Sequence, residues 1–167
     1  MLDWAQGAAA AEMHIKVPPG GQARVELTSD LQGVALDLPQ PWAKPAALSR
    51  SLHAAMPLAG AQRRLVLDID EQLHLGVLMG EQGFVGGSLG FGALLPAEEA
   101  GRFLLGGSVD TLNWDTWSEF VEAYVLGGQE RKPASPAAAL LFGVRALDIH
   151  QLEVLGQQLE DVRLNAA

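Results

Sequence analysis

Residues 63–79 have the sequence RRLVLDIDEQLHLGVLM, in which apolar side chains recur at every other position along two consecutive stretches. The first stretch runs from Leu65 to Ile69 and the second from Leu73 to Met79. A period of two is typical of strands with one buried face. The acidic pair Asp70-Glu71 lies between the stretches and favours a tight turn. The segment therefore predicts an antiparallel β-hairpin.

The same alternation extends away from the hairpin in both directions. The downstream segments that follow it are dense in glycine, and missing side chains permit bulges or close approach of the backbone. The pattern predicts a mainly β protein with antiparallel strands joined by short turns. Besides the hairpin, we expect strands over residues 22–28, 34–38, 83–91, 101–109, 139–149, 152–155 and 160–165.

One amphipathic helix is predicted near residues 115–126. Thr116 and Glu119 have the spacing of a capping box, and Gly127-Gly128 favours the end of the helix. Residues 127–138 carry charges and two prolines, which predicts a flexible loop. The apolar residues of the helix recur at a helical period: Trp117, Phe120, Val121, Tyr124 and Val125.

Composition limits the classes of function that fit this chain. Its 167 residues predict a single β-rich domain over 1–167. The net charge of −9 predicts no nucleic-acid partner, because phosphates would be repelled. The absence of cysteine excludes disulfides and thiolate chemistry. No apolar run approaches the roughly 20 residues of a membrane helix, and the first residues lack the basic region of a secretory signal.

The residues that could carry chemistry do not form a catalytic pattern. His14, His53, His74 and His150 lack the spacing of a metal site, so no metal and no cofactor is expected. We interpret the acidic cluster of residues 68–71 as a solvated hairpin end rather than a pair of catalytic carboxylates. The glycines of residues 83–92 lack the lysine and the helix of a phosphate-binding loop. The sequence therefore predicts a protein that is not an enzyme.

Two tryptophans have different interpretations. Trp117 lies on the apolar stripe of the predicted helix and is interpreted as core. Trp42 lies in a proline-rich loop, where packing in the core and stacking against a ligand fit equally well.

Three segments resemble a known family. Residues 29–45 (SDLQGVALDLPQPWAKP) run from an alternating strand into a proline-rich loop, residues 107–117 lead from a strand into the helix, and residues 147–164 form a strand pair. Together they resemble the YhdP proteins, large AsmA-like proteins of the Gram-negative envelope, over roughly residues 22–166. Trp42-Ala43 departs from the Leu-Gly step expected there.

This resemblance implies a segment of a longer protein that is periplasmic and anchored in the inner membrane by a helix outside this chain. It implies a curved antiparallel sheet, an open groove or taco-like half-barrel, with the helix packed on it. The implied function is phospholipid transport between the inner and outer membranes. The implied partners are phospholipid acyl chains and neighbouring β-segments of the parent chain, with membrane contact through the parent protein only.

Two readings of the apolar strand faces remain open. In the first, they line a lipid groove. In the second, they form the sealed core of a structural or protein-binding module such as an assembly scaffold. From the alternation, the candidate groove residues are Val25, Leu27, Leu65, Leu67, Ile69, Leu73, Leu75, Val77, Phe84, Leu89, Phe103 and Leu105.

Overall fold

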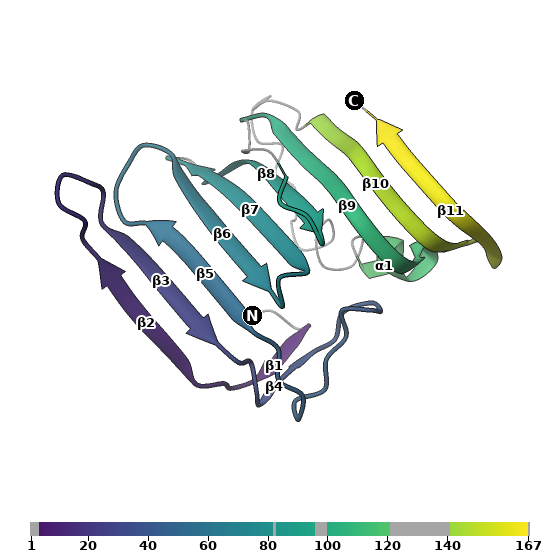
Figure 1. Cartoon of the computed structure of the whole chain (residues 1–167), viewed down its shortest axis with the longest axis horizontal. Helices are drawn as coiled ribbons and strands as arrows, with labels where there is room; N and C mark the ends of the chain where they lie inside the picture. Colours follow the sequence, from purple (N-terminus) through teal and green to yellow (C-terminus); the bar gives the residue numbers. More distant parts are fainter. Residues whose placement is uncertain (1–3, 82, 96–99, 121–140, 167) are drawn as a thin grey trace, which may run out of the picture.

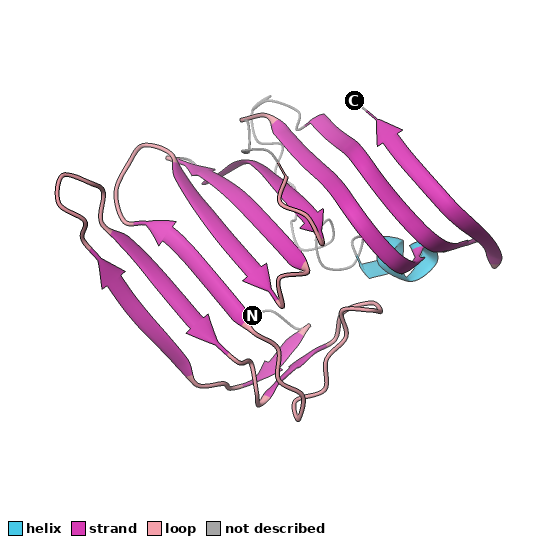
Figure 2. Cartoon of the chain, in the orientation of Figure 1, coloured by secondary structure: helices cyan, strands magenta, loops and turns pink. Residues whose placement is uncertain are grey.

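The computed structural model describes residues 4–81, 83–95, 100–120 and 141–166. Nine strands form one large sheet in the spatial order β11-β10-β9-β8-β7-β6-β5-β3-β2 (Figure 1). The predicted mainly β class is confirmed, and strands dominate the described chain in Figure 2. The strands are β2 (Ala11–Lys16), β3 (Arg24–Ser29), β5 (Leu52–Pro57), β6 (Arg63–Ile69), β7 (Leu73–Gly80), β8 (Gly83–Phe91), β9 (Arg102–Asn113), β10 (Leu141–Val154) and β11 (Gln157–Ala166).

The hairpin predicted from residues 63–79 is confirmed as β6 and β7. Ile69 pairs with Leu73 at the turn, and the strands stay in register to the pair Arg63 and Met79. Asp70 and Glu71 adopt left-handed φ values of 53° and 55°. Aspartate tolerates this region better than branched side chains do, so Asp70 fits the turn that it forms.

The sheet is mostly antiparallel, as predicted, except at the two neighbours of β9. β8 pairs with β9 in parallel, and β9 pairs with β10 in parallel, whereas the other neighbours in the large sheet are antiparallel. Alternation marks a residue as part of a strand but carries no information about direction. The direction of a strand follows from the segment that connects it to its neighbour. Parallel neighbours require a crossover connection, and the one between β9 and β10 begins with the helix that follows β9. The large sheet is therefore mixed.

Several strand boundaries also differ from those predicted. The segments expected over residues 139–149 and 152–155 form one strand, β10, which continues to Val154. A register shift lies between Val144 and Leu147, where Ala146 has a φ of 47°. The break expected after Ile149 has another cause: the apolar positions change parity between Ile149 and Leu152, although the strand continues through both. The strands β2 and β5 were not predicted.

The helix α1 spans Trp114–Phe120 in the described residues and follows β9 directly. The predicted capping box of Thr116 and Glu119 is wrong. Instead, the Asn113 side-chain oxygen accepts hydrogen bonds from the Thr116 backbone N–H at 2.9 Å and from its hydroxyl at 3.0 Å. Asn113 is therefore the N-cap. The remainder of the predicted helix and the loop predicted over 127–138 lie outside the described residues.

A small second sheet, β1 (Ala5–Gly7) with β4 (Val34–Leu36), lies beside the ends of the central strands (Figure 1). The loop after β4 carries a buried lysine, Lys44, which is only 2% exposed and whose backbone pairs with that of Leu36. The Lys44 ammonium donates hydrogen bonds to the carbonyl oxygens of Leu31 at 2.7 Å and Val34 at 2.6 Å. A buried cation needs such partners, so Lys44 fixes the start of β4 and the loop that follows.

Candidate functional site

All twelve candidate groove residues lie on one face of the large sheet, which we call the apolar face. Residues that are direct partners across two strands share a face. Leu67 is the partner of Leu75, Leu75 of Leu89, and Leu89 of Leu105, which carries the face across four strands. Ala54 connects Leu67 to Leu27 on the other side. The lipid-binding role of these twelve residues stays a prediction.

The apolar face is only partly covered. Eleven of the twelve residues are half-buried, and Phe84 is 45% exposed. By comparison, Ile149 in the core is 1% exposed. The described residues therefore leave a large apolar surface in partial contact with water, and contiguous surfaces of this kind mark binding sites for apolar partners.

Two aromatic rings lie where β8 and β9 begin, at one end of this face. The ring centroids of Phe84 and Phe103 are 6.3 Å apart. Gly87 is the register partner of Phe103, and a Cβ at Gly87 would lie 2.9 Å from the Phe103 ring and 2.8 Å from the Gly76 carbonyl oxygen. The absence of a side chain at Gly87 thus lets the Phe103 ring lie directly against the backbone of β8.

The face continues onto two strands that the sequence reasoning missed. Met13 and Ile15 of β2 are 63% and 64% exposed, and they are the partners of Leu27 and Val25. On β5, Leu52 and Met56 extend the same face. The alternation in β2 (AEMHIK) was available as a signal. In β5 (LHAAMP) the central alanine pair obscures it, since alanine marks neither face.

One end of the apolar face is sealed by the loop that follows β4. Trp42 is 6% exposed, and its ring centroid lies 5.9 Å from that of Phe91. Trp42 therefore belongs to the core, which resolves the two interpretations of this residue. The predicted core position of Trp117 is also confirmed: it packs against this core, and its indole N–H donates to the Gln40 carbonyl oxygen at 3.3 Å.

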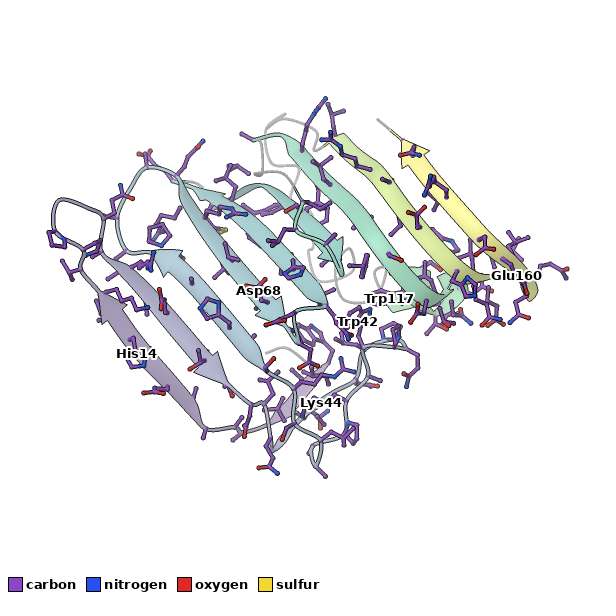
Figure 3. All side chains as sticks on the ribbon, in the orientation of Figure 1. His14, Trp42, Lys44, Asp68, Trp117 and Glu160 are labelled. Carbon is purple, nitrogen blue, oxygen red and sulfur yellow. The ribbon has the colours of Figure 1, made fainter. Side chains whose placement is uncertain are left out.

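The sealed core gathers where the loop, the ends of β8 to β10 and α1 meet. Figure 3 shows Trp42 and Trp117 close to this junction. Leu73 and Leu89 of the candidate set pack against it, so they form the boundary between the sealed and the uncovered parts of the face. The core consists of Trp42, Phe91, Val109, Leu112, Leu147, Ile149 and Leu152.

The opposite face of the first strands is polar. Glu26 forms ion pairs with Lys16 at 2.6 Å and with Arg24 at 2.7 Å. The hydrogen bond from Lys16 and the two positive charges hold the pKa of Glu26 below its usual value. Thus β2 and β3 present charge on one face and apolar side chains on the other. An amphipathic sheet of this kind needs an apolar partner on one face only.

Two acidic residues of the cluster at residues 68–71 make structural contacts. His74 Nδ1 lies 2.6 Å from the Asp68 carboxylate, across neighbouring strands of the polar face. The Asp70 carboxylate accepts a hydrogen bond from the Ser51 backbone N–H at 2.7 Å, which ties the hairpin turn to the start of β5. Within the described part of the chain, no group of three or more histidine or acidic side chains is arranged to hold a metal ion.

A shallow pocket lies at the ends of the first strands, where residues such as Glu12, Thr28 and His53 line it. These three side chains belong to the polar face, and none of the twelve candidate groove residues lines the pocket. No helix among the described residues is long and apolar enough to cross a membrane.

Comparison with known proteins identifies one match. The model of a family described as YhdP protein matches residues 1–167. No curated protein and no solved structure matches the chain.

Proposed function

The chain belongs to the YhdP family, and from this premise we propose that its apolar face holds phospholipid acyl chains within an envelope protein that transports lipids. The observation that carries the proposal is an apolar face that runs through the strands of the large sheet and stays half-exposed outside the sealed core. Membership of the family is consistent with envelope-associated lipid transport.

The dimensions of the face fit an acyl chain. β7 has eight residues, which at about 3.3 Å per residue extend roughly 26 Å. One leaflet of a bilayer contributes about 15 Å of hydrocarbon, half of a core about 30 Å thick. The face is therefore long enough for one acyl chain to lie against it over its whole length.

The physical basis of the proposed binding is burial of hydrocarbon. Each methylene group removed from water contributes about 0.8 kcal/mol. The half-exposed leucines along β6 and β7 gain from the same contact, because their remaining exposed area is covered. A headgroup can stay in water at the rim, so transport along such a face needs no chemical step. This account assigns the protein no enzymatic activity and no cofactor.

We place the parent protein in the periplasm with its anchor in the inner membrane. In this arrangement the present segment contacts the membrane only through other parts of the parent. Neighbouring β-segments of that parent would extend the apolar face along the path of the lipid, beyond the edge formed by β11. The expected curvature would make the face concave, which increases the surface of each acyl chain that is covered.

The sealed core around Ile149 favours a second candidate for one end of the molecule. There the apolar side chains are buried by the loop of Trp42, as in a closed structural module. In that reading the sheet is a scaffold or protein-binding module, and its uncovered face contacts protein rather than lipid. The two candidates differ in whether the uncovered part of the face binds acyl chains.

A matched pair of variants on β3 tests the proposal. Leu27 and Thr28 are neighbours that lie on opposite faces, and their strand partners are Ala54 and His53 respectively. Leu27→Gln should weaken binding of a fluorescent phosphatidylcholine several-fold, whereas Thr28→Gln should leave it unchanged. The same neutral side chain is introduced in both, so a charge effect on the headgroup is avoided. Equal binding by the two variants, or no binding by the wild type, would contradict the proposal.

A further inference from the structure

The two edge strands of the large sheet differ in how well they are protected from pairing. An edge strand exposes unpaired backbone N–H and C=O groups, and proteins protect such edges with irregular backbone or charge. In β11, Asp161 has a φ of 52°, so the backbone is irregular within the strand. In β2, all six residues are exposed, and none has a positive φ or is a proline. Among the described residues, β2 is the last strand of the sheet and its backbone is regular, so its charged side chains determine which strand can pair with it.

The side chains of β2 are complementary to those of a second, antiparallel β2. If the two strands pair about His14, Glu12 of one copy lies opposite Lys16 of the other, and this contact occurs twice. In the same register Met13 lies opposite Ile15 of the second copy. Opposite charges and apolar pairs that are direct partners across strands stabilise a sheet. From this self-complementarity we propose that β2 is a docking edge for a second copy of this chain.

The existing contacts of β2 are compatible with this pairing. Glu12 contacts His14 of its own strand at 3.0 Å, and its side chain is 73% exposed. Lys16 contacts Glu26 at 2.6 Å, and an ammonium group has three donors, so it can also reach a carboxylate of the second copy. Figure 3 shows His14, the proposed centre, on the outermost strand of the sheet.

The pairing would also remove the exposed apolar side chains at this edge from water. Met13 and Ile15 lie on the apolar face of their own sheet, and antiparallel partners share a face. The apolar face of one copy would then continue into that of the other. The inference does not depend on lipid binding, since it rests on the edge, its charges and its regular backbone.

Charge variants test the pairing through the oligomeric state. Glu12→Lys and Lys16→Glu each convert two attractive contacts into two repulsive ones, so each variant alone should dimerise about tenfold more weakly than the wild type. An equimolar mixture of the two variants restores both attractive contacts and should dimerise like the wild type. Sedimentation velocity over a concentration series measures these equilibria, and urea unfolding verifies that both variants are folded.

Glu160→Lys on β11 is the matched control. It makes the same change to the net charge of −9 as Glu12→Lys, at the opposite edge of the sheet. A less negative chain repels its copies less, so a non-specific charge effect would strengthen association in both variants. The proposed pairing instead predicts weaker association for Glu12→Lys only. A monomeric wild type at millimolar concentration, or a mixture no tighter than the single variants, would overturn the proposal.

The register can be tested separately because the chain contains no cysteine. Residues opposite each other in antiparallel strands have Cα atoms about 4.5–5.5 Å apart, which a disulfide can bridge. His14→Cys should therefore form a covalent dimer on mild oxidation. Thr28→Cys, which is exposed but lies one strand inward, should not. Equal yields of covalent dimer from the two variants would overturn the proposed register.

Discussion

Leu67→Glu and Leu75→Glu separate an open face from a sealed core. The two leucines are direct partners on β6 and β7, both are half-buried, and neither belongs to the sealed core. A glutamate at either position can turn its carboxylate toward water. Ile149→Glu is the comparison variant, because Ile149 is 1% exposed and its replacement would bury a carboxylate.

The expected difference in stability follows from this difference in exposure. Complete burial of a leucine side chain contributes about 1.5–3 kcal/mol, so the loss of a half-buried one should cost about 1–2 kcal/mol. At Ile149 the same loss is larger, and an unpaired carboxylate in the core adds several kcal/mol even after its pKa rises. The total is a large part of the roughly 5–15 kcal/mol that stabilises a domain.

Urea unfolding followed by circular dichroism measures these free energies, alongside binding of a fluorescent phospholipid. We expect both leucine variants to remain folded at low urea and to lose lipid binding. We expect Ile149→Glu to unfold at much lower urea than either. If the leucine variants lose as much stability as Ile149→Glu, the face is sealed in solution and the closed module becomes the better account.

Three further variants test individual structural contacts. Lys44→Met removes an ammonium that donates to three backbone carbonyl oxygens, and should lower the free energy of unfolding in urea by about 2 kcal/mol. An unchanged value would show that these hydrogen bonds contribute nothing net. Gly87→Ala places a methyl group against the Phe103 ring and should lower the thermal midpoint, at a cost of about 1–3 kcal/mol, whereas a raised midpoint would contradict the close approach. The Arg163 guanidinium, through its hydrogen bond, holds the pKa of Asp148 below its usual value. The pair therefore stabilises the fold above about pH 4, and this stabilisation is lost as the pH falls through the lowered pKa. Arg163→Gln should therefore make stability less dependent on pH in that acidic range, and equal acid dependence in both proteins would argue against the pair.

The strands with strong alternation could be predicted from the sequence. The hairpin of β6 and β7 and the strand β8 have the expected boundaries within one or two residues, because their apolar positions repeat with a period of two. β5 has a weak pattern, since Ala54 and Ala55 mark neither face. The same period of two also made it possible to assign Leu67, Leu75 and their neighbours to a single face.

Two features depend on contacts between distant segments and had no local signal. The parallel pairing of β9 with β8 and β10 depends on how the chain crosses between strands. The burial of Trp42 depends on Phe91, which lies on another strand. The helix cap, in contrast, is a local contact: Asn113, a residue type preferred at this position, lies one residue before the helix, and the capping box at Thr116 was placed one turn too late. The alternation of apolar residues predicted the two faces of the strands, but not which segments cover them.

The central claim is that the apolar face contacts acyl chains, and photo-crosslinking tests it most directly. The chain contains no cysteine, so Leu67→Cys and His53→Cys can each carry a single thiol-linked benzophenone. His53 lies on the polar face, and its partner on the neighbouring strand is Asp68. Asp68 directly follows Leu67, so the two labels would lie close together but on opposite faces of the sheet. After irradiation with phosphatidylcholine, mass spectrometry should find lipid attached to the label at position 67 and not to the label at position 53. Equal attachment at both positions, or attachment at position 53 alone, would contradict the account.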